Sequence, residues 1–288
     1  MTKPSWQDFG TYDESAFPEY WDGVVGAWCP SLGPTGGRLH DHSRFVNWGT
    51  LTNMDNATDW PISSGQYALD YDGTNDFVNI GRISAYDSTR WRTLSAWVNA
   101  RSFDSPSNYN DIIGCDFIGG TREWVMAVAR GPTSASGGIG CGIFGTGGGE
   151  IGAETSRIIL TNQWTHLCVT QDGSYTFGGF AMYINGKPQT LTNTSSGTFT
   201  APRVGTNALR IGIRPGPGGQ DLHWNGLIDD TTIWQRTLTA NEVRDLYLLG
   251  RCGMYERRRR SRRRAIEQAA AFKAYWVRQK SQMIGGGV

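Results

Sequence analysis

Between residues 24 and 234 the chain is divided into short apolar or alternating segments, separated at close intervals by turn-forming residues. Segments of this length, bounded in this way, are typical of β-strands, so the pattern favours an all-β protein with many short strands. The 39 glycines and 12 tryptophans suit the same class. The expected strands are residues 24–28, 67–71, 77–80, 93–100, 112–115, 124–129, 139–144, 158–160, 164–171, 180–185, 209–213 and 227–234.

The segment at residues 93–100 shows how these strands are expected to pack. Leu94, Ala96 and Val98 project to one face, whereas Trp97 projects to the other. A strand with a tryptophan on its second face is often covered on both sides. The pattern therefore predicts a strand inside a β-sandwich.

One short helix is expected after the last strand. Thr239 and Glu242 have the spacing of a capping box, and Leu238 with Val243 forms the matching hydrophobic staple. Gly250 is a natural C-terminal stop. The β domain is therefore expected to span residues 23–250.

Residues 131–152 contain ten glycines and few bulky side chains. The favoured interpretation is a long flexible hairpin loop. The alternative is a rim at which a ligand approaches the backbone closely, because glycine leaves the backbone uncovered.

The two ends of the chain differ from this body. Residues 1–22 are polar and aromatic and are interpreted as an arm that lies on a surface. Residues 251–288 hold 11 Lys and Arg against two acidic residues, whereas residues 1–250 hold 16 basic and 24 acidic residues. A cationic tail on an anionic body indicates a docking partner for the tail.

The composition of the tail favours a helix with one broad apolar arc. The residues expected to anchor it are Arg257, Arg258, Arg259, Arg260, Arg262, Arg263, Arg264, Ile266, Phe272 and Trp276. Three interpretations stay open: a solvated charge run, a nucleic-acid contact through the arginines, and an anchor seated on a protein.

Cysteine usage and the absence of apolar runs suggest where the chain is made. The five cysteines are scattered, without a CxxC pair, and are expected to be free thiols in a reducing cytosol. No signal peptide is expected in the first ten residues, and no stretch approaches the length of a membrane-spanning helix.

Several segments, in this order, resemble a known family. They are GVVGAW, YALDYDGTNDFVNIG, LSAWVNA, WTHLCVTQDG, FAMYINGKP, LRIG and GLIDDTTIWQRTLTANEVRDLY. Together they resemble a laminin-G-like domain of the concanavalin A-like lectin/glucanase superfamily, over about residues 23–250. The resemblance implies a two-sheet antiparallel jelly roll, in a family whose members bind sugars, bind proteins, act as spacers or hydrolyse β-glucans.

Hydrolysis is not expected of this chain. A glycoside hydrolase needs two carboxylates on either side of the scissile bond, and the Glu-x-Asp-x-x-Glu pattern of the superfamily's glucanases is absent. Asp229 and Asp230 are adjacent, so their side chains are expected on opposite faces. Glu150 and Glu154 are expected in or beside the glycine-rich loop, without an alternating strand around them.

Two kinds of binding site are considered. The resemblance implies a structural calcium held by Asp41 and Asp229, and no other cofactor is expected. For a glycan, His223, Trp224 and Asn225 form the most lectin-like cluster, and Trp124 is a further aromatic candidate. The alternative for both tryptophans is ordinary burial in the core.

A β-sandwich with a short basic tail resembles structural proteins of tailed bacteriophages. The hypothesis is therefore a non-enzymatic virion protein, a capsid decoration or fibre-like component, made in the host cytoplasm. The tail would bind capsid or other virion proteins in a homo- or hetero-oligomeric assembly, the sandwich would face host glycans, and no membrane is involved. The alternatives are a cellular carbohydrate-binding or adhesion module and a nucleic-acid-associated protein.

Overall fold

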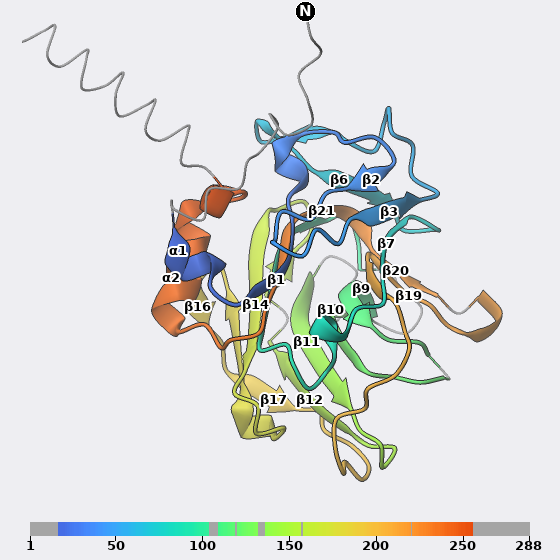
Figure 1. Ribbon diagram of the computed structural model, residues 1–288, viewed down its shortest axis with the longest axis vertical. Helices are drawn as coiled ribbons and strands as arrows, with labels where there is room; N and C mark the ends of the chain where they lie inside the picture. The colour runs from blue at the N-terminus through green and yellow to red at the C-terminus, as the bar shows by residue number, and fades with distance from the viewer. Residues whose placement is uncertain are drawn as a thin grey trace, which may run out of the picture.

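The computed structural model describes residues 17–103, 109–118, 120–131, 136–156, 158–219 and 221–255. Within them, two antiparallel β-sheets pack face to face (Figure 1). This arrangement confirms the predicted all-β, two-sheet jelly-roll sandwich.

The first sheet has the order β1-β21-β8-β14-β15-β16 among the described residues, and β6 also pairs with β21. Its strands are β1 (Val24–Trp28), β6 (Leu69–Asp72), β8 (Thr93–Ala100), β14 (Thr165–Gln171), β15 (Phe180–Ile184), β16 (Lys187–Pro188) and β21 (Asn225–Trp234). The long β8, β14 and β21 form its centre, and all three were predicted as strands.

The second sheet has the order β17-β12-β11-β10-β9-β18-β7-β3-β2 among the described residues, and β13 pairs with β11. Its strands are β2 (Arg38–Leu39), β3 (Gly49–Thr52), β7 (Phe77–Gly81), β9 (Tyr109–Cys115), β10 (Trp124–Arg130), β11 (Ser136–Phe144), β12 (Glu150–Thr155), β13 (Ile159–Leu160), β17 (Leu191–Asn193) and β18 (Leu209–Ile211). Two small pairs flank the sandwich: β4 (Ile62–Ser63) with β5 (Gln66–Tyr67), and β19 (Ile213–Arg214) with β20 (Leu222–His223).

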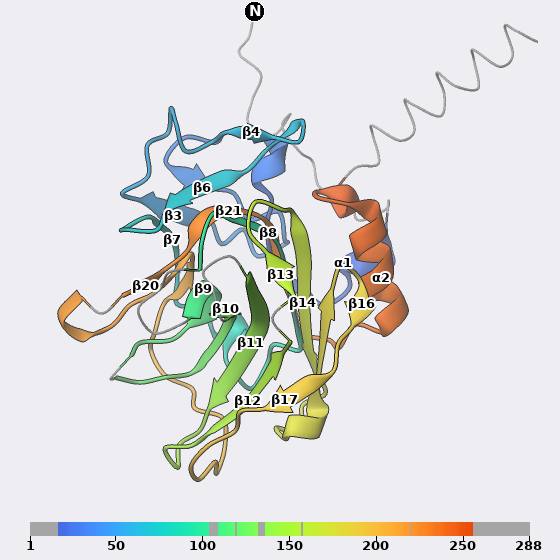
Figure 2. The same ribbon diagram turned by 180° about the vertical axis from the view of Figure 1, so that it is seen from behind.

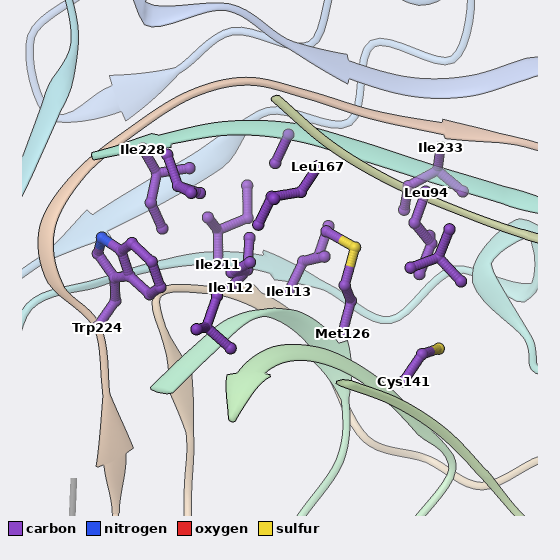
Figure 3. Packing of buried hydrophobic residues seen from close by; sticks show 14 of the residues in the cluster. Leu94, Ile112, Ile113, Met126, Cys141, Leu167, Ile211, Trp224, Ile228 and Ile233 are labelled. Atoms are coloured by element: carbon purple, nitrogen blue, oxygen red, sulfur yellow. The ribbon is translucent and has the colours of Figure 1, made fainter. Parts of the chain in front are cut away.

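The main core lies between the two sheets, because alternate residues of the facing strands point inward. Leu94 of β8 lies there with Ile112 and Met126 of the second sheet (Figure 3). Val98 of β8 belongs to the same cluster. These side chains are fully buried. The predicted alternation of residues 93–100 is therefore confirmed on the core side.

The outer face of the first sheet is covered by helix α2 (Ala240–Leu249), beside which lies the short α1 (Pro18–Trp21) (Figures 1 and 2). Trp97, on the second face of β8, stacks on Tyr247 of α2 with the ring centroids 5.8 Å apart. The predicted capping box is present, since Thr239 accepts from the Glu242 amide and the Glu242 carboxylate accepts from the Thr239 amide.

Short 3-10 turns complete the described elements. They are η2 (Pro30–Leu32), η3 (Ser84–Tyr86), η4 (Phe177–Gly179), η5 (Pro217–Gly219) and η6 (Gly253–Tyr255). The turn η6 carries the chain back onto the sandwich after α2. Met254 and Tyr255 pack there in a second apolar cluster with Trp21. The packed part of the chain therefore reaches Tyr255, beyond the boundary expected at residue 250.

The glycine-rich stretch differs from its favoured interpretation as a flexible loop. Most of its described residues belong to β11 and to the start of β12, which pair from Gly140 to Phe144 in continuous antiparallel register. The strand predicted at residues 139–144 lies within β11, whereas β12 was not predicted as a strand. Glycine lacks the side chain by which alternation is recognised in a sequence.

Candidate functional site

The strands β9 to β12 turn one face toward the core and the other away from it. In β10, Trp124, Met126 and Val128 point into the main core, whereas Val125 and Ala127 belong to a separate small cluster on the outer face. This outer face of the second sheet carries a hollow of about 140 Å³. We call it the outer hollow.

The outer hollow has a floor of small residues and walls of aromatic and charged side chains. It is lined by Tyr109, Arg122, Val125, Ala127, Gly140, Cys141, Gly142, Phe144, Glu150, Gly152, Ala153, Glu154, Thr194 and Arg214. Gly140, Gly142 and Gly152 leave the backbone uncovered. A Cβ atom on Gly152 would lie 2.5 Å from the Thr194 hydroxyl, so only glycine fits there without a shift.

A β-bulge interrupts the pairing of β9 with β10 next to Ala127, which lines the outer hollow. The register between β9 and β10 shifts between Met126 and Ala127, so that Ala127 pairs with Asp111 and Met126 pairs with Ile113. A bulge inserts one extra residue and changes the face to which the following side chains point. Here it keeps Ile112 and Ile113 in the core.

Two arginines that line the outer hollow are already paired with aspartates. Nε of Arg214 lies 2.8 Å from Oδ2 of the buried Asp111, and its Nη1 lies 3.5 Å from Oδ2 of Asp116. Nη2 of Arg122 lies 2.7 Å from the same Asp116 oxygen. The Arg122 guanidinium also lies over the ring of Phe144, 3.6 Å from its centroid. The pairs fix both guanidinium groups as walls of the hollow.

The carboxyl groups of the site are affected by burial. Desolvation raises the pKa of Asp111 to about 7, although Arg214 acts in the opposite direction. Burial also raises the pKa of Glu150, against the attraction of Arg122. The Tyr109 hydroxyl donates to Oε1 of Glu154 over 2.5 Å, which orients that carboxylate.

The position of the two glutamates corrects the sequence interpretation. Glu150, Gly152 and Glu154 alternate along β12, so both carboxylates line the outer hollow. The signal was present in the sequence, because Ile151 and Ala153 alternate with them and pack on the core side. The glycines around it favour the interpretation as a loop and hide this alternation.

The two tryptophans proposed for sugar stacking are in the core. Trp124 and Trp224 are both fully buried, and Figure 3 shows Trp224 among the core side chains. Nε1 of Trp124 donates to the Tyr86 carbonyl oxygen over 2.7 Å. Neither indole face is open to a ligand, so the alternative of ordinary burial is correct for both.

His223 and Asn225 flank this buried tryptophan on β20 and β21. His223 is half-buried, and its Nε2 lies 3.9 Å from Oδ2 of Asp221. The amide of Asn225 donates to the Ser102 hydroxyl over 3.1 Å. With Trp224 buried between them, the predicted His-Trp-Asn cluster has no aromatic platform, and none of the three lines the outer hollow.

The carboxylates expected to hold calcium are occupied by hydrogen-bond donors. Oδ1 of Asp41 accepts from the amides of Ala27 and Ser43, and its Oδ2 accepts from the Ser43 hydroxyl and the Asn47 amide. This carboxylate braces the loop that follows it. Each of its two oxygens accepts two hydrogen bonds.

Asp229 is fully buried, and its carboxylate, like that of Asp41, already has hydrogen-bond partners. It accepts from the amides of Ser31 and Asp230, and Nη1 of Arg251 lies 3.4 Å from its Oδ2. A neighbouring guanidinium disfavours a cation at the same carboxylate. These residues do not fit a calcium ion, and the described part of the chain holds no cluster of three or more His, Cys, Asp or Glu suited to a metal.

The anchoring residues predicted in the tail lie outside the described residues, as do residues 1–16 of the arm. They are Arg257, Arg258, Arg259, Arg260, Arg262, Arg263, Arg264, Ile266, Phe272 and Trp276. Among the described residues, no helix has the length and apolar character needed to cross a membrane.

Comparison with solved structures finds the same fold in several proteins of low sequence identity. The binding domain of Paraclostridial Mosquitocidal Protein 1 superposes with a TM-score of 0.54 at 16% identity, over 79% of this chain and 52% of that one. The receptor-binding domain of botulinum neurotoxin type G gives 0.52 at 16% identity, over 79% and 51%. The chain thus spans about half the length of these toxin domains, and the likeness concerns the fold.

Domain 4 of AbnA, an extracellular GH43 arabinanase from Geobacillus stearothermophilus, is matched over nearly its whole length. Its structure in complex with arabinotriose superposes with a TM-score of 0.52 at 17% identity, over 78% of this chain and 98% of that domain. No curated protein sequence matches the chain.

A family model provides the assignment. The model described as the concanavalin A-like lectin/glucanases superfamily matches residues 72–244, more than half of the 288 residues. Those residues include β8, β14 and β21 of the first sheet and the strands β9 to β12 that carry the outer hollow. The laminin-G-like resemblance of the sequence is thereby confirmed, and the chain belongs to the concanavalin A-like lectin/glucanases superfamily.

Proposed function

We propose that this chain is a non-enzymatic carbohydrate-binding module that holds one neutral sugar residue of a glycan in the outer hollow. The observation that carries the proposal is the combination of a glycine floor with carboxylate, guanidinium and aromatic walls. Planar polar groups bind sugar hydroxyls, and aromatic rings pack against the apolar face of a pyranose or furanose ring.

The size of the hollow favours a single ring. Its volume of about 140 Å³ is well below the ~300–1,000 Å³ of pockets that enclose a drug-sized ligand. A longer glycan would therefore extend along the sheet surface, with one residue inserted over Gly140 and Gly142. In the structural relative from the arabinanase, arabinotriose is such a short neutral oligosaccharide.

The charges favour hydroxyl donors over acidic sugars. Asp111 and Asp116 already neutralise the two arginines, and Glu150 and Glu154 add two further carboxylates to the lining. A carboxylate accepts hydrogen bonds from sugar hydroxyls but repels an anionic group. Sialic and uronic acids are therefore expected to bind more weakly than neutral sugars.

The carboxylates of the hollow do not favour hydrolysis. Glu150 and Glu154 lie on one strand with Gly152 between them, at the place where the Glu-x-Asp-x-x-Glu pattern of the superfamily's glucanases has an aspartate. Glu154 is moreover engaged by Tyr109, whose hydroxyl donates to its Oε1. The missing aspartate and this contact support binding without catalysis.

Titration calorimetry with arabinotriose and a panel of neutral and acidic oligosaccharides tests this function. Gly142→Val adds bulk to the floor at a position without positive φ, where the atoms nearest to an added Cβ belong to Phe144 and Glu150, at 3.4 Å or more. It is expected to weaken neutral-sugar binding by about tenfold or more. Gly37→Val, at an exposed glycine, is the matched control and should bind as the unaltered protein does.

Two results would contradict the proposal. One is unchanged affinity in Gly142→Val while the variant stays folded, since the ligand then binds elsewhere. The other is preferential binding of acidic sugars, which the carboxylates of the lining would not allow.

We further propose that the module is displayed on a virion, as a capsid decoration or fibre-like protein attached through its basic C-terminal segment. The support is the clustering of seven arginines between residues 257 and 264 beside an acidic body. Removal of residues 256–288 is then expected to leave sugar binding intact and to abolish incorporation into particles. Loss of steep salt-dependent nucleic-acid binding would instead support the nucleic-acid-associated alternative, and retention of all functions would support a cellular binding module.

A further inference from the structure

The residues that follow α2 are held firmly on the sandwich. We call residues 251–255 the root segment. The guanidinium of Arg251 lies 3.4 Å from Oδ2 of Asp229 and 4.0 Å from the ring centroid of Trp164. The Cys252 amide donates to Oδ2 of Asp230 over 2.9 Å. Two adjacent aspartates of β21 therefore hold two adjacent residues of the root segment.

A bulge in β21 makes this double contact feasible. The register between β21 and β8 shifts between Asp229 and Thr232, and Asp230 has a left-handed backbone with φ 47°. In a regular strand the two carboxylates would leave on opposite faces, as the sequence predicts. The bulge instead lets both contact the root segment.

A thiol from the other end of the domain reaches the same place. Cys29 directly follows β1, and its Sγ donates to Oδ1 of Asp229 over 4.0 Å. The Cys29 and Cys252 thiols contact one another as hydrogen-bond partners. Each residue is only 2% exposed. Two cysteines far apart in the chain are therefore in contact at the junction between β1, β21 and the root segment.

We propose that Cys29 and Cys252 are a disulfide-forming pair that covalently ties the root segment to the first strand. A disulfide requires Cβ atoms about 3.5–4.5 Å apart, and contact between the two thiols is the geometric precondition for that. The other three cysteines, Cys115, Cys141 and Cys168, lie within β9, β11 and β14. The bond would form where a small disulfide such as oxidised glutathione is present.

The proposed disulfide forms by two thiol–disulfide exchange steps with oxidised glutathione. The thiolate of one cysteine attacks a sulfur of oxidised glutathione, which forms a mixed disulfide and releases one reduced glutathione. The thiolate of the second cysteine then attacks the protein sulfur of that mixed disulfide and releases the second reduced glutathione. Two protein thiols are oxidised, one glutathione disulfide is reduced, and the two protons end on the glutathione thiols.

Burial decides when this exchange occurs. Desolvation raises the pKa of the Cys29 thiol well above its usual value, so little thiolate exists in the closed domain at neutral pH. The disulfide is therefore expected to form during folding or during local opening of the root segment. Once formed, the same burial protects it from reductants.

Thiol counting after refolding tests the pair. The protein is refolded in a glutathione buffer of oxidising composition, denatured with small thiols removed, and titrated. The accessible thiols are expected to fall from five to three, and unreduced peptide mapping should recover a Cys29–Cys252 cross-link. The oxidised form should melt on the order of 10 °C higher than the reduced form, because the bond closes a very long loop.

Variants separate this pair from the other thiols. Cys29→Ser and Cys252→Ser should each titrate four thiols before and after oxidation, with no change in melting temperature. Cys168→Ser, which removes another buried cysteine, is the matched control and should fall from four to two. Five thiols in the oxidised, folded wild-type protein, or a cross-link between other cysteines, would overturn the proposal. The mapping uses the wild-type chain, so it stands even where a serine variant fails to fold.

Discussion

At the scale of single residues, Asp230 combines a left-handed backbone with a carboxyl group that is almost completely buried. Burial and the neighbouring Asp229 raise its pKa from 3.8 to about 7. The folded state thus keeps a proton that the unfolded chain has already released. The free energy of unfolding is therefore expected to fall as the pH rises from about 4 to about 7, and to level off above that range.

Asp230→Asn should make this slope shallower. Asparagine tolerates a positive φ and can still accept from the Cys252 amide, but it does not titrate. Urea unfolding between pH 5 and pH 8 measures the slope, to which Asp111 also contributes. Asp22→Asn, at an aspartate whose side chain is 80% exposed, is the control and should leave the slope unchanged. An identical slope in Asp230→Asn would contradict the account.

The same scale shows where prediction of the site from sequence failed. Trp124 and Trp224 were candidates because they fall near turn residues, yet both point into the core. Nearness to a turn along the chain does not decide which face of a strand a side chain occupies. The residues of the outer hollow, such as Tyr109 and Arg214, come from separate strands, and no local pattern in the sequence brings them together.

At the scale of elements, the root segment is expected to stabilise the whole domain. The side chains of Arg251 and Asp229 are 6% and 0% exposed. Arg251→Met would leave a buried carboxylate without its charged partner, and should lower the free energy of unfolding by about 3 kcal/mol at pH 7. Chemical denaturation measures this loss.

Arg244→Met is the matched comparison for that variant. Arg244 lies on the exposed side of α2, so its replacement should change stability by less than about 0.5 kcal/mol. Equal stabilities of the two variants would show that the ion pair between Arg251 and Asp229 contributes nothing to the free energy of unfolding.

Elements differ in how far their sequences reveal them. Helix α2 was predicted from its capping box and terminal glycine, because these signals are local hydrogen-bonding rules. Residues 139–144 of β11 were predicted as a strand, but β12 and its pairing with β11 were not, because glycines interrupt the apolar-polar pattern of this stretch. The glycines that hide this pairing also form the floor of the outer hollow.

At the scale of the whole molecule, the sandwich was predictable because each sheet is assembled from short segments with their own strand signals. The contact between the two ends of the described chain was not predictable from the sequence. Trp21 of α1 and Tyr255 of η6 meet edge to face with centroids 5.1 Å apart, and α1 and α2 lie side by side (Figure 2). Such contacts between distant segments depend on the complete fold, and composition alone does not encode them.

The location of a bound neutral oligosaccharide tests the central claim most directly. A crystal structure of the protein with arabinotriose, or with the tightest neutral ligand of the panel, is predicted to place one sugar ring over Gly140 and Gly142, beside Phe144. Its hydroxyls are expected to donate to Glu150 or Glu154. A ligand bound instead beside His223, or on the face covered by α2, would contradict the account.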